Sequence, residues 1–185
     1  MRARRRFGQN FLHDPAVIDR IVAAIAPAPG QALIEIGPGH GALTDLVLQR
    51  AGRLDAVEID RDLIAELRAR WPAEAGLVVH ECDALEFDFA ALAAARGGKL
   101  RVYGNLPYNI STPLLFRLLD SVDAIADMHF MLQKEVVDRI VAAPDSDAYG
   151  RLGVMLAPRL AATRLFEVGP GAFRPAPQVR SAIVQ

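Results

Sequence analysis

Residues 32–41 read Ala-Leu-Ile-Glu-Ile-Gly-Pro-Gly-His-Gly and decide the fold class of this chain of 185 residues. The first five form an apolar run, broken only by Glu35, that predicts a buried strand. The glycines at alternate positions predict a tight turn, because glycine adopts backbone conformations that other residues avoid. A buried strand that ends in a glycine-rich turn is typical of α/β proteins whose backbone approaches a ligand closely.

Strands and helices alternate on both sides of this stretch. A helix capped by Asp14, with Pro15 at its first position, precedes it. Further apolar runs predict strands over 54–59, 77–80, 100–103, 128–132, 165–168 and 182–184. Helical spacing of apolar residues predicts helices over 42–49, 61–70, 112–119, 134–142 and 151–159. This alternation predicts an α/β domain whose mostly parallel sheet carries helices on both faces.

The composition excludes several classes of protein. Apolar residues make up 52% of the chain and charged residues 23%, which is typical of a folded domain. We expect no membrane span, because the chain lacks an apolar run of about 18 residues. Cys82 is the single cysteine, so no internal disulfide can form and nothing indicates secretion. We expect a monomeric, cytoplasmic protein that needs no metal.

The net charge of −1 hides an uneven distribution. Residues 1–14 carry a formal charge of +3 and residues 150–185 carry +4, whereas the residues between them carry −8. Basic ends around an acidic middle indicate a polyanionic partner that contacts the ends. Arginines exposed to solvent without a partner are the alternative, and charge alone does not separate the two.

Two carboxylates follow the predicted strands at positions suited to a nucleoside. Glu58 ends the second strand, 21 residues after Gly37, where a carboxylate can accept hydrogen bonds from both ribose hydroxyls. Asp83 follows the third strand and can accept from an adenine amine. The structural alternatives are that Glu58 is a solvated acid at a strand end and that Asp83 is a turn or cap residue. The glycine spacing differs from the dinucleotide fingerprint G-x-G-x-x-G, so we favour S-adenosylmethionine (SAM) over NAD as the cofactor.

Asn105-Leu106-Pro107-Tyr108, after the fourth strand, is the most specific feature of the sequence. The nitrogen of an exocyclic aromatic amine is a poor nucleophile, because its lone pair is delocalised into the ring. The Asn105 side-chain oxygen and the Leu106 carbonyl can accept from the amine and free that lone pair. Pro107 shapes the turn, and Tyr108 can stack on a base turned out of its helix. An Asn-x-Pro turn with a core tyrosine is the structural alternative.

Phe173 stands in a proline-braced segment, Phe173-Arg174-Pro175-Ala176-Pro177, and can cover the other face of such a base. An apolar anchor for the segment is the alternative. The segment is too rich in proline to be a central strand.

Five motifs in order resemble the ribosomal RNA adenine dimethyltransferase family, most closely its bacterial enzymes of the small subunit. They are Gly8-Gln9-Asn10-Phe11-Leu12, Glu35-Ile36-Gly37-Pro38-Gly39, Asn105-Leu106-Pro107-Tyr108-Asn109-Ile110-Ser111, Gln133-Lys134-Glu135 and Phe173-x-Pro-x-Pro-x-Val179-x-Ser181. They span nearly the whole chain. The resemblance implies a class I SAM-dependent methyltransferase fold (Rossmann-like), with a seven-stranded, mostly parallel sheet whose last strand is antiparallel.

The resemblance also implies a function and its residues. The expected reaction dimethylates N6 of two adjacent adenosines in the 3′-terminal hairpin loop of 16S rRNA, late in small-subunit biogenesis. Asn105, Leu106, Pro107 and Tyr108 would hold the target amine and base, with Phe173 stacking from the other side. The implied SAM contacts are Gln9, Asn10, Leu12, Gly37, Gly39, Glu58, Ile59, Asp83, Ala84 and Asn105. The expected RNA contacts are Arg4, Arg5, Arg6, Arg174 and Arg180.

The family also differs from this chain in its length. Family members continue into a small helical domain, so we interpret residues 1–185 as the catalytic domain, with a basic segment over 1–13. Three alternatives remain: an antibiotic-resistance enzyme acting on large-subunit rRNA, a DNA adenine methyltransferase and a non-catalytic ribosome-assembly factor. A nicotinamide dehydrogenase fits worst, because of the glycine spacing.

Overall fold

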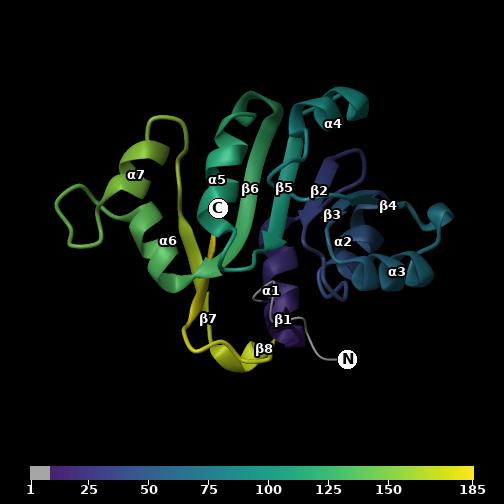
Figure 1. Cartoon of the computed structure of the whole chain (residues 1–185), viewed down its shortest axis with the longest axis horizontal. Helices are drawn as coiled ribbons and strands as arrows, with labels where there is room; N and C mark the ends of the chain where they lie inside the picture. Colours follow the sequence, from purple (N-terminus) through teal and green to yellow (C-terminus); the bar gives the residue numbers. More distant parts are fainter. Residues whose placement is uncertain (1–8) are drawn as a thin grey trace.

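A computed structural model describes residues 9–185 of the chain, in which seven strands form one sheet. These strands are β2 (Ala32–Ile36), β3 (Leu54–Glu58), β4 (Leu77–Glu81), β5 (Leu100–Asn105), β6 (Ile125–Gln133), β7 (Arg164–Val168) and β9 (Ser181–Val184). Their order across the sheet is β4-β3-β2-β5-β6-β9-β7 (Figure 1). β9 runs antiparallel to both of its neighbours, whereas β2 to β6 pair in parallel. The predicted class I sheet, with its antiparallel last strand, is confirmed.

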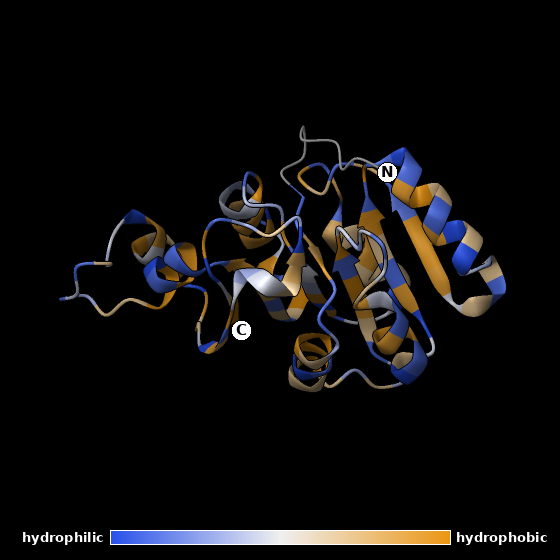
Figure 2. Cartoon of the chain, turned by 90° about the horizontal axis from the view of Figure 1, so that it is seen from below, coloured by the Kyte–Doolittle hydropathy of each residue, from blue (hydrophilic) through white to orange (hydrophobic). Residues whose placement is uncertain are grey.

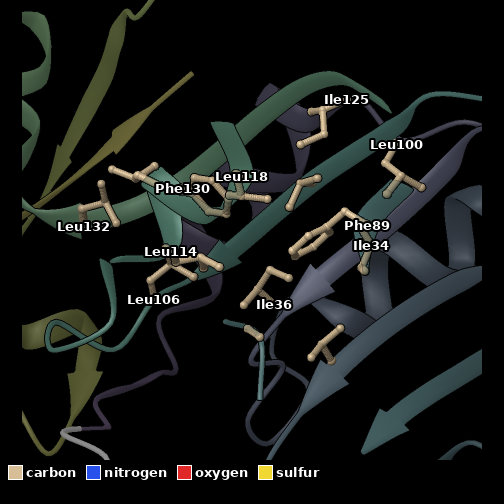
Figure 3. Close-up of a cluster of buried hydrophobic side chains, with 14 of the residues drawn as sticks. Ile34, Ile36, Phe89, Leu100, Leu106, Leu114, Leu118, Ile125, Phe130 and Leu132 are labelled. Atoms are coloured by element: carbon tan, nitrogen blue, oxygen red, sulfur yellow. The ribbon is translucent and has the colours of Figure 1, made fainter. Parts of the chain in front are cut away.

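Helices cover both faces of the sheet, as predicted. They are α1 (Pro15–Ile25), α2 (Thr44–Ala51), α3 (Arg61–Arg70), α4 (Phe89–Arg96), α5 (Ser111–Leu119), α6 (Lys134–Val141) and α7 (Arg151–Leu156). Short 3-10 turns span 73–75, 122–124 and 170–172. α1, α2 and α3 pack on one face and α4 to α7 on the other, so the hydrophobic core is split into two clusters. The larger cluster is drawn in Figure 3.

The helix sequences explain why these faces are buried. The Asp14 carboxylate accepts hydrogen bonds from the backbone of Ala16 at 2.9 Å and Val17 at 3.4 Å, which caps α1. The apolar residues of α1 recur at helical spacing, and its buried positions face the sheet. In Figure 2 the strands are largely orange, whereas the helices carry blue and orange residues in alternation. No helix of residues 9–185 is both long and apolar enough to cross a membrane.

Helix α4 was not predicted from the sequence. Its run of alanines lacks the bulky apolar residues that mark an amphipathic helix, although two capping signals frame it. The Asp88 carboxylate accepts from the Ala91 amide at 2.9 Å, and Gly97 ends the helix in the left-handed conformation. A helix at this place supplies the crossover that the parallel strands β4 and β5 require.

A second, two-stranded sheet joins the N-terminal segment to the segment that precedes β9. β1 (Phe11–Leu12) pairs antiparallel with β8 (Phe173–Arg174), and the His13 amide donates to the Ala172 carbonyl at 2.9 Å. These strands were not predicted from the sequence, because two residues are too few to show a pattern. The proline-rich segment after Phe173 stays out of the central sheet, as expected.

The order of the strands positions the site. The chain proceeds from β2 outward to β3 and β4, then returns to β5 on the other side of β2. In open α/β sheets, ligands bind at the carboxyl ends of the strands where the order reverses in this way. The reversal between β2 and β5 therefore brings the glycine-rich turn beside Asn105.

Candidate functional site

A cavity of about 310 Å³ lies at the carboxyl ends of β2, β3, β4 and β5. Every residue predicted to contact SAM lines it, as do the four residues of the Asn-Leu-Pro-Tyr motif: Gln9, Asn10, Leu12, Gly37, Gly39, Glu58, Ile59, Asp83, Ala84, Asn105, Leu106, Pro107 and Tyr108. The cavity combines an apolar lining with a few carboxylate and amide groups, which is typical of a small-molecule site. Contacts with a bound cofactor remain predictions for each residue.

The glycine-rich turn forms one wall of the cavity. Gly39 has a positive φ of 59°, and a Cβ atom there would lie 3.0 Å from the Phe11 ring. Glycine therefore lets the N-terminal segment lie directly on the turn. On the other side, a Cβ atom at Gly104 would lie 2.4 Å from the Ile36 carbonyl. Glycine at position 39 thus lets β1 lie close to the turn, and glycine at position 104 lets β5 lie close to the end of β2.

Glu58 lies at the centre of this wall and is nearly fully buried. One carboxylate oxygen accepts from the amides of Ile59 and Asp60, each at 3.0 Å, and the other accepts from the Gly39 amide at 3.3 Å. Burial raises the pKa of Glu58 above its ordinary value, although these hydrogen bonds oppose the shift. Glu58 thus holds the glycine turn against β3. The oxygen facing Gly39 keeps lone pairs for a further donor such as a ribose hydroxyl.

Asp83 lies at the next strand end. One of its carboxylate oxygens accepts from the Leu85 amide at 2.9 Å, which supports the turn alternative and leaves the other oxygen for a ligand. Ile59 exposes 46% of its surface although it is apolar, and it lines the same cavity. Cys82 also lines the cavity, and burial raises the pKa of its thiol. A planar base therefore finds an apolar surface beside a free acceptor.

Glu35 lines the cavity but was not predicted as a site residue. One of its carboxylate oxygens accepts from the Thr44 hydroxyl at 2.8 Å and from the Tyr103 hydroxyl at 2.9 Å. Burial raises its pKa to about 7, against an ordinary value of 4.5. The signal in the sequence was a single carboxylate in an otherwise apolar strand, because a buried acid without a pairing partner is uncommon.

The Asn-Leu-Pro-Tyr motif, at the end of β5, lines the same cavity beside β2. The Asn105 side-chain amide donates to the Asn10 carbonyl at 3.0 Å, and the Leu106 amide donates to the Met131 carbonyl at 3.2 Å. The Leu106 side chain is buried in the core cluster near Leu114 (Figure 3), so only its backbone can serve a ligand. The Tyr108 ring is half-buried, and its hydroxyl lies 3.0 Å from the Ser181 hydroxyl.

The remaining predicted residues lie apart from the cavity wall. Phe173 is only 2% exposed and is packed in the core cluster between the sheet and α1, which agrees with the anchor alternative. Its stacking role stays a prediction. Arg174 is exposed, whereas the Arg180 guanidinium donates to Glu167 at 3.1 Å. Arg4, Arg5 and Arg6 lie outside the described residues.

The donors and acceptors of the cavity fit SAM. Three carboxylates line it, namely Glu35, Glu58 and Asp83, and SAM carries a positive charge, two ribose hydroxyls and an adenine amine that can use them. The wall formed by Asn105 and Tyr108 faces the same space, so an amine held there would lie beside the cofactor.

Known proteins match this chain over its whole length. The family model described as ribosomal RNA adenine dimethylase matches residues 1–185. A ribosomal RNA small subunit methyltransferase A from Aromatoleum aromaticum is 60% identical over 184 residues, which cover 100% of this chain and 68% of the relative. The protein of the same name from Pseudomonas aeruginosa is 56% identical, with the same coverage. The chain thus spans about two thirds of the length of these curated relatives.

Two solved structures resemble this one over most of the chain. A dimethyladenosine transferase from Plasmodium falciparum has a TM-score of 0.82 and 30% sequence identity, covering 94% of this chain and 62% of its own. The 23S rRNA methyltransferase ErmE has a TM-score of 0.79 and 26% identity, covering 95% and 68%. The match over the whole sequence, together with relatives at 56–60% identity, shows that the chain belongs to the ribosomal RNA adenine dimethylase family.

Proposed function

We propose that this chain transfers methyl groups from SAM to the N6 amine of two adjacent adenosines in the 3′-terminal hairpin loop of 16S rRNA. The observation that carries the proposal is that Glu58, at the end of β3, and Asn105, at the end of β5, line one cavity on either side of β2. Glu58 suits the ribose of the cofactor, and Asn105 suits the amine that receives the methyl group. The curated relatives named for the small ribosomal subunit support this choice of RNA.

The N-terminal segment orients the Asn105 side chain through one hydrogen bond. Its amide nitrogen donates to the Asn10 carbonyl, so its side-chain oxygen remains an acceptor for the cavity. In this role the oxygen and the Leu106 carbonyl each accept one hydrogen of the target amine. The two hydrogen bonds withdraw the lone pair of the amine from the ring and point it toward the cofactor, which is electrostatic preorganisation rather than strong base catalysis.

The carboxylates and the exposed apolar group hold the cofactor. When bound, SAM supplies a methyl group activated by a positively charged sulfur. Glu58 accepts from the ribose, Asp83 from the adenine amine, and Ile59 covers a face of the adenine. Because these residues come from the ends of two neighbouring strands, β3 and β4, the sheet fixes the direction in which the cofactor lies.

RNA binding rests on the arginines predicted near the two ends of the chain. Arg174 is exposed and lies in β8, which pairs with β1, and the Phe11 ring of β1 lies against Gly39 of the glycine turn. Arg180 serves less well, because Glu167 pairs with its guanidinium. We retain Arg4, Arg5 and Arg6 as RNA contacts on their charge alone. The affinity that such contacts give to RNA binding falls steeply as the salt concentration rises.

The large-subunit alternative has support of its own, because ErmE resembles this structure over most of the chain. The small-subunit relatives are more than twice as similar in sequence, at 56–60% identity against 26%. That difference favours the small subunit. The protein would act on its rRNA in the cytoplasm.

Primer extension on purified ribosomal subunits tests the proposal, because dimethyladenosine blocks base pairing and stops reverse transcription. The chain is incubated with SAM and with small or large subunits that lack the modification. We expect stops at two adjacent adenosines near the 3′ end of 16S rRNA, only when SAM is present. Stops in 23S rRNA would support the large-subunit alternative. SAM binding without any methylation would support the assembly factor.

A further inference from the structure

The hydroxyl of Tyr108 is held by a residue 73 positions away in the sequence. Tyr108 belongs to the turn between β5 and α5 and lines the cavity. Its hydroxyl lies 3.0 Å from the hydroxyl of Ser181. The ring is therefore held at both ends, by the turn at its backbone and by Ser181 at its tip.

Ser181 is anchored more firmly than Tyr108. It begins β9 and is 1% exposed. Its backbone lies opposite Gln133 of β6 on one side and Val168 of β7 on the other. The preceding residue, Arg180, accepts from the Lys134 amide at 2.9 Å. A hydroxyl on an interior strand of the sheet therefore sets the position of a side chain that stands on a turn.

The pairing also explains how a buried serine is satisfied. A buried hydroxyl requires a hydrogen-bond partner, and the Tyr108 hydroxyl supplies it. The conformational entropy of the Tyr108 side chain is thus lost on folding and not when a ligand arrives. Preorganisation of this kind favours an aromatic surface that must meet a planar ligand in one orientation.

We propose that Ser181 is a positioning residue, which fixes the Tyr108 ring as the surface on which the target base stacks. This inference rests on the proposed function, in which Tyr108 contacts the adenine. Ser181 itself touches neither the base nor the cofactor in this role.

The two methyl transfers depend on this ring to different degrees. Before the first transfer the amine carries two hydrogens, which Asn105 and Leu106 can both hold. Each transfer forms a bond from nitrogen to the methyl carbon, breaks the bond from that carbon to sulfur, and releases one proton from nitrogen to solvent. After the first, the nitrogen carries one hydrogen and one methyl group. One acceptor contact then remains, so stacking on Tyr108 contributes more to the orientation of the base.

The variants Ser181→Ala and Tyr108→Phe each remove the hydrogen bond and keep the aromatic ring. We expect each to lower the rate of methylation of unmodified small subunits about threefold to tenfold, as the loss of one hydrogen bond implies. Monomethyladenosine should accumulate relative to dimethyladenosine, while the dissociation constant for SAM stays within about twofold of the wild-type value. The double variant should be no slower than either single one, because all three lack the same bond.

Two variants serve as matched controls. Ser146→Ala removes an exposed serine hydroxyl that donates to the nearby Ala143 carbonyl at 2.8 Å, and Tyr149→Phe removes an exposed phenol. Both should keep the wild-type rate and product ratio. Rates and product ratios in Ser181→Ala that match these controls would overturn the inference, and so would additive losses in the double variant.

A readout that is independent of activity separates this inference from the proposed function. The chain has three tyrosines, so the ring signals in a ¹³C-tyrosine NMR spectrum can be assigned with single Tyr→Phe variants. We expect Ser181→Ala to shift the Tyr108 signal and increase its mobility, with the other two unchanged. An unmoved Tyr108 signal overturns the inference. An inactive wild-type enzyme with a Tyr108 signal that does respond overturns only the proposed function.

Discussion

The side-chain amide of Asn105 donates a hydrogen bond of 3.0 Å to the backbone carbonyl of Asn10. The two residues are 95 positions apart, and both line the cavity. The bond joins the N-terminal segment to the end of β5, so these two parts of the cavity lining form one unit. Because the nitrogen of the Asn105 amide donates this bond, its oxygen is left as an acceptor.

Replacement of Asn105 by alanine should separate binding from chemistry. Removal of a preorganised acceptor of this kind typically lowers the rate about 10²-fold or more. We expect a single-turnover rate of methyl transfer reduced by that factor, while the calorimetric affinity for SAM falls much less, because Glu58 and Asp83 remain. Turnover close to that of the wild type would show that Asn105 does not hold the amine.

The buried acid Glu35 should make stability depend on pH. Its pKa is about 7 in the folded protein against 4.5 for the exposed group, so the folded state binds more protons between these values. Stability is therefore highest below pH 4.5 as far as Glu35 is concerned, and it falls as the pH rises to about 7. The full effect amounts to about 3 kcal/mol.

Denaturant unfolding at pH 5 and pH 8 measures this dependence in the wild type and in Glu35→Gln. The variant keeps an oxygen for the hydroxyls of Thr44 and Tyr103 but cannot ionise. We expect its unfolding free energy to fall less between the two pH values. Equal slopes in both proteins would mean that Glu35 ionises in the folded state as easily as in water.

Asp55 and Arg96 should matter for stability and not for the cofactor. The buried carboxylate accepts from the Arg96 guanidinium at 2.8 and 2.6 Å and is 2.8 Å from His80. Although burial opposes ionisation, these partners hold the pKa of Asp55 below 3.8. This contribution to stability is present above pH 3.8 and is lost as the pH falls through the lower, folded value.

Arg96→Ala leaves that carboxylate buried without its main partner. We expect the unfolding free energy to fall by about 3 kcal/mol, with SAM affinity unchanged. Asp55→Asn combined with Arg96→Ala should recover part of the loss, because no charge is then left unpaired. A loss below about 1 kcal/mol for the single variant would place the pair among ordinary surface ion pairs.

Arg117 should influence cofactor binding from a distance. Its guanidinium donates to the carbonyls of Leu85 and Phe87, each at 3.1 Å, and so ties α5 to the loop that follows Asp83. We expect Arg117→Ala to raise the KM for SAM about tenfold, with a smaller change in kcat, because hydrogen bonds from a charged donor hold this loop. Steady-state kinetics with Arg53→Ala, an exposed arginine, provide the control. A fall in kcat at constant KM would contradict the assignment.

The sequence alone was sufficient to locate seven strands and most of the helices along the chain. Strand β2 and helix α3 have the predicted bounds, because apolar periodicity and capping residues are local properties. The carboxylates Glu58 and Asp83 could be placed together as well, since the carboxyl ends of parallel strands meet at one edge of a sheet. Helix α4 was missed, because its alanines carry little periodic signal although the chain connection requires it.

Tertiary structure decided which side chains point into the site. Phe173 follows the pattern of a stacking residue, yet its ring is buried in the core beside α1. Glu35 is local to the motif, but its hydrogen bond from Tyr103 depends on the pairing of β2 with β5. The contacts of Asn10 with Asn105 and of Tyr108 with Ser181 join segments far apart in the chain. Such contacts are set by strand order and register, which local periodicity does not encode.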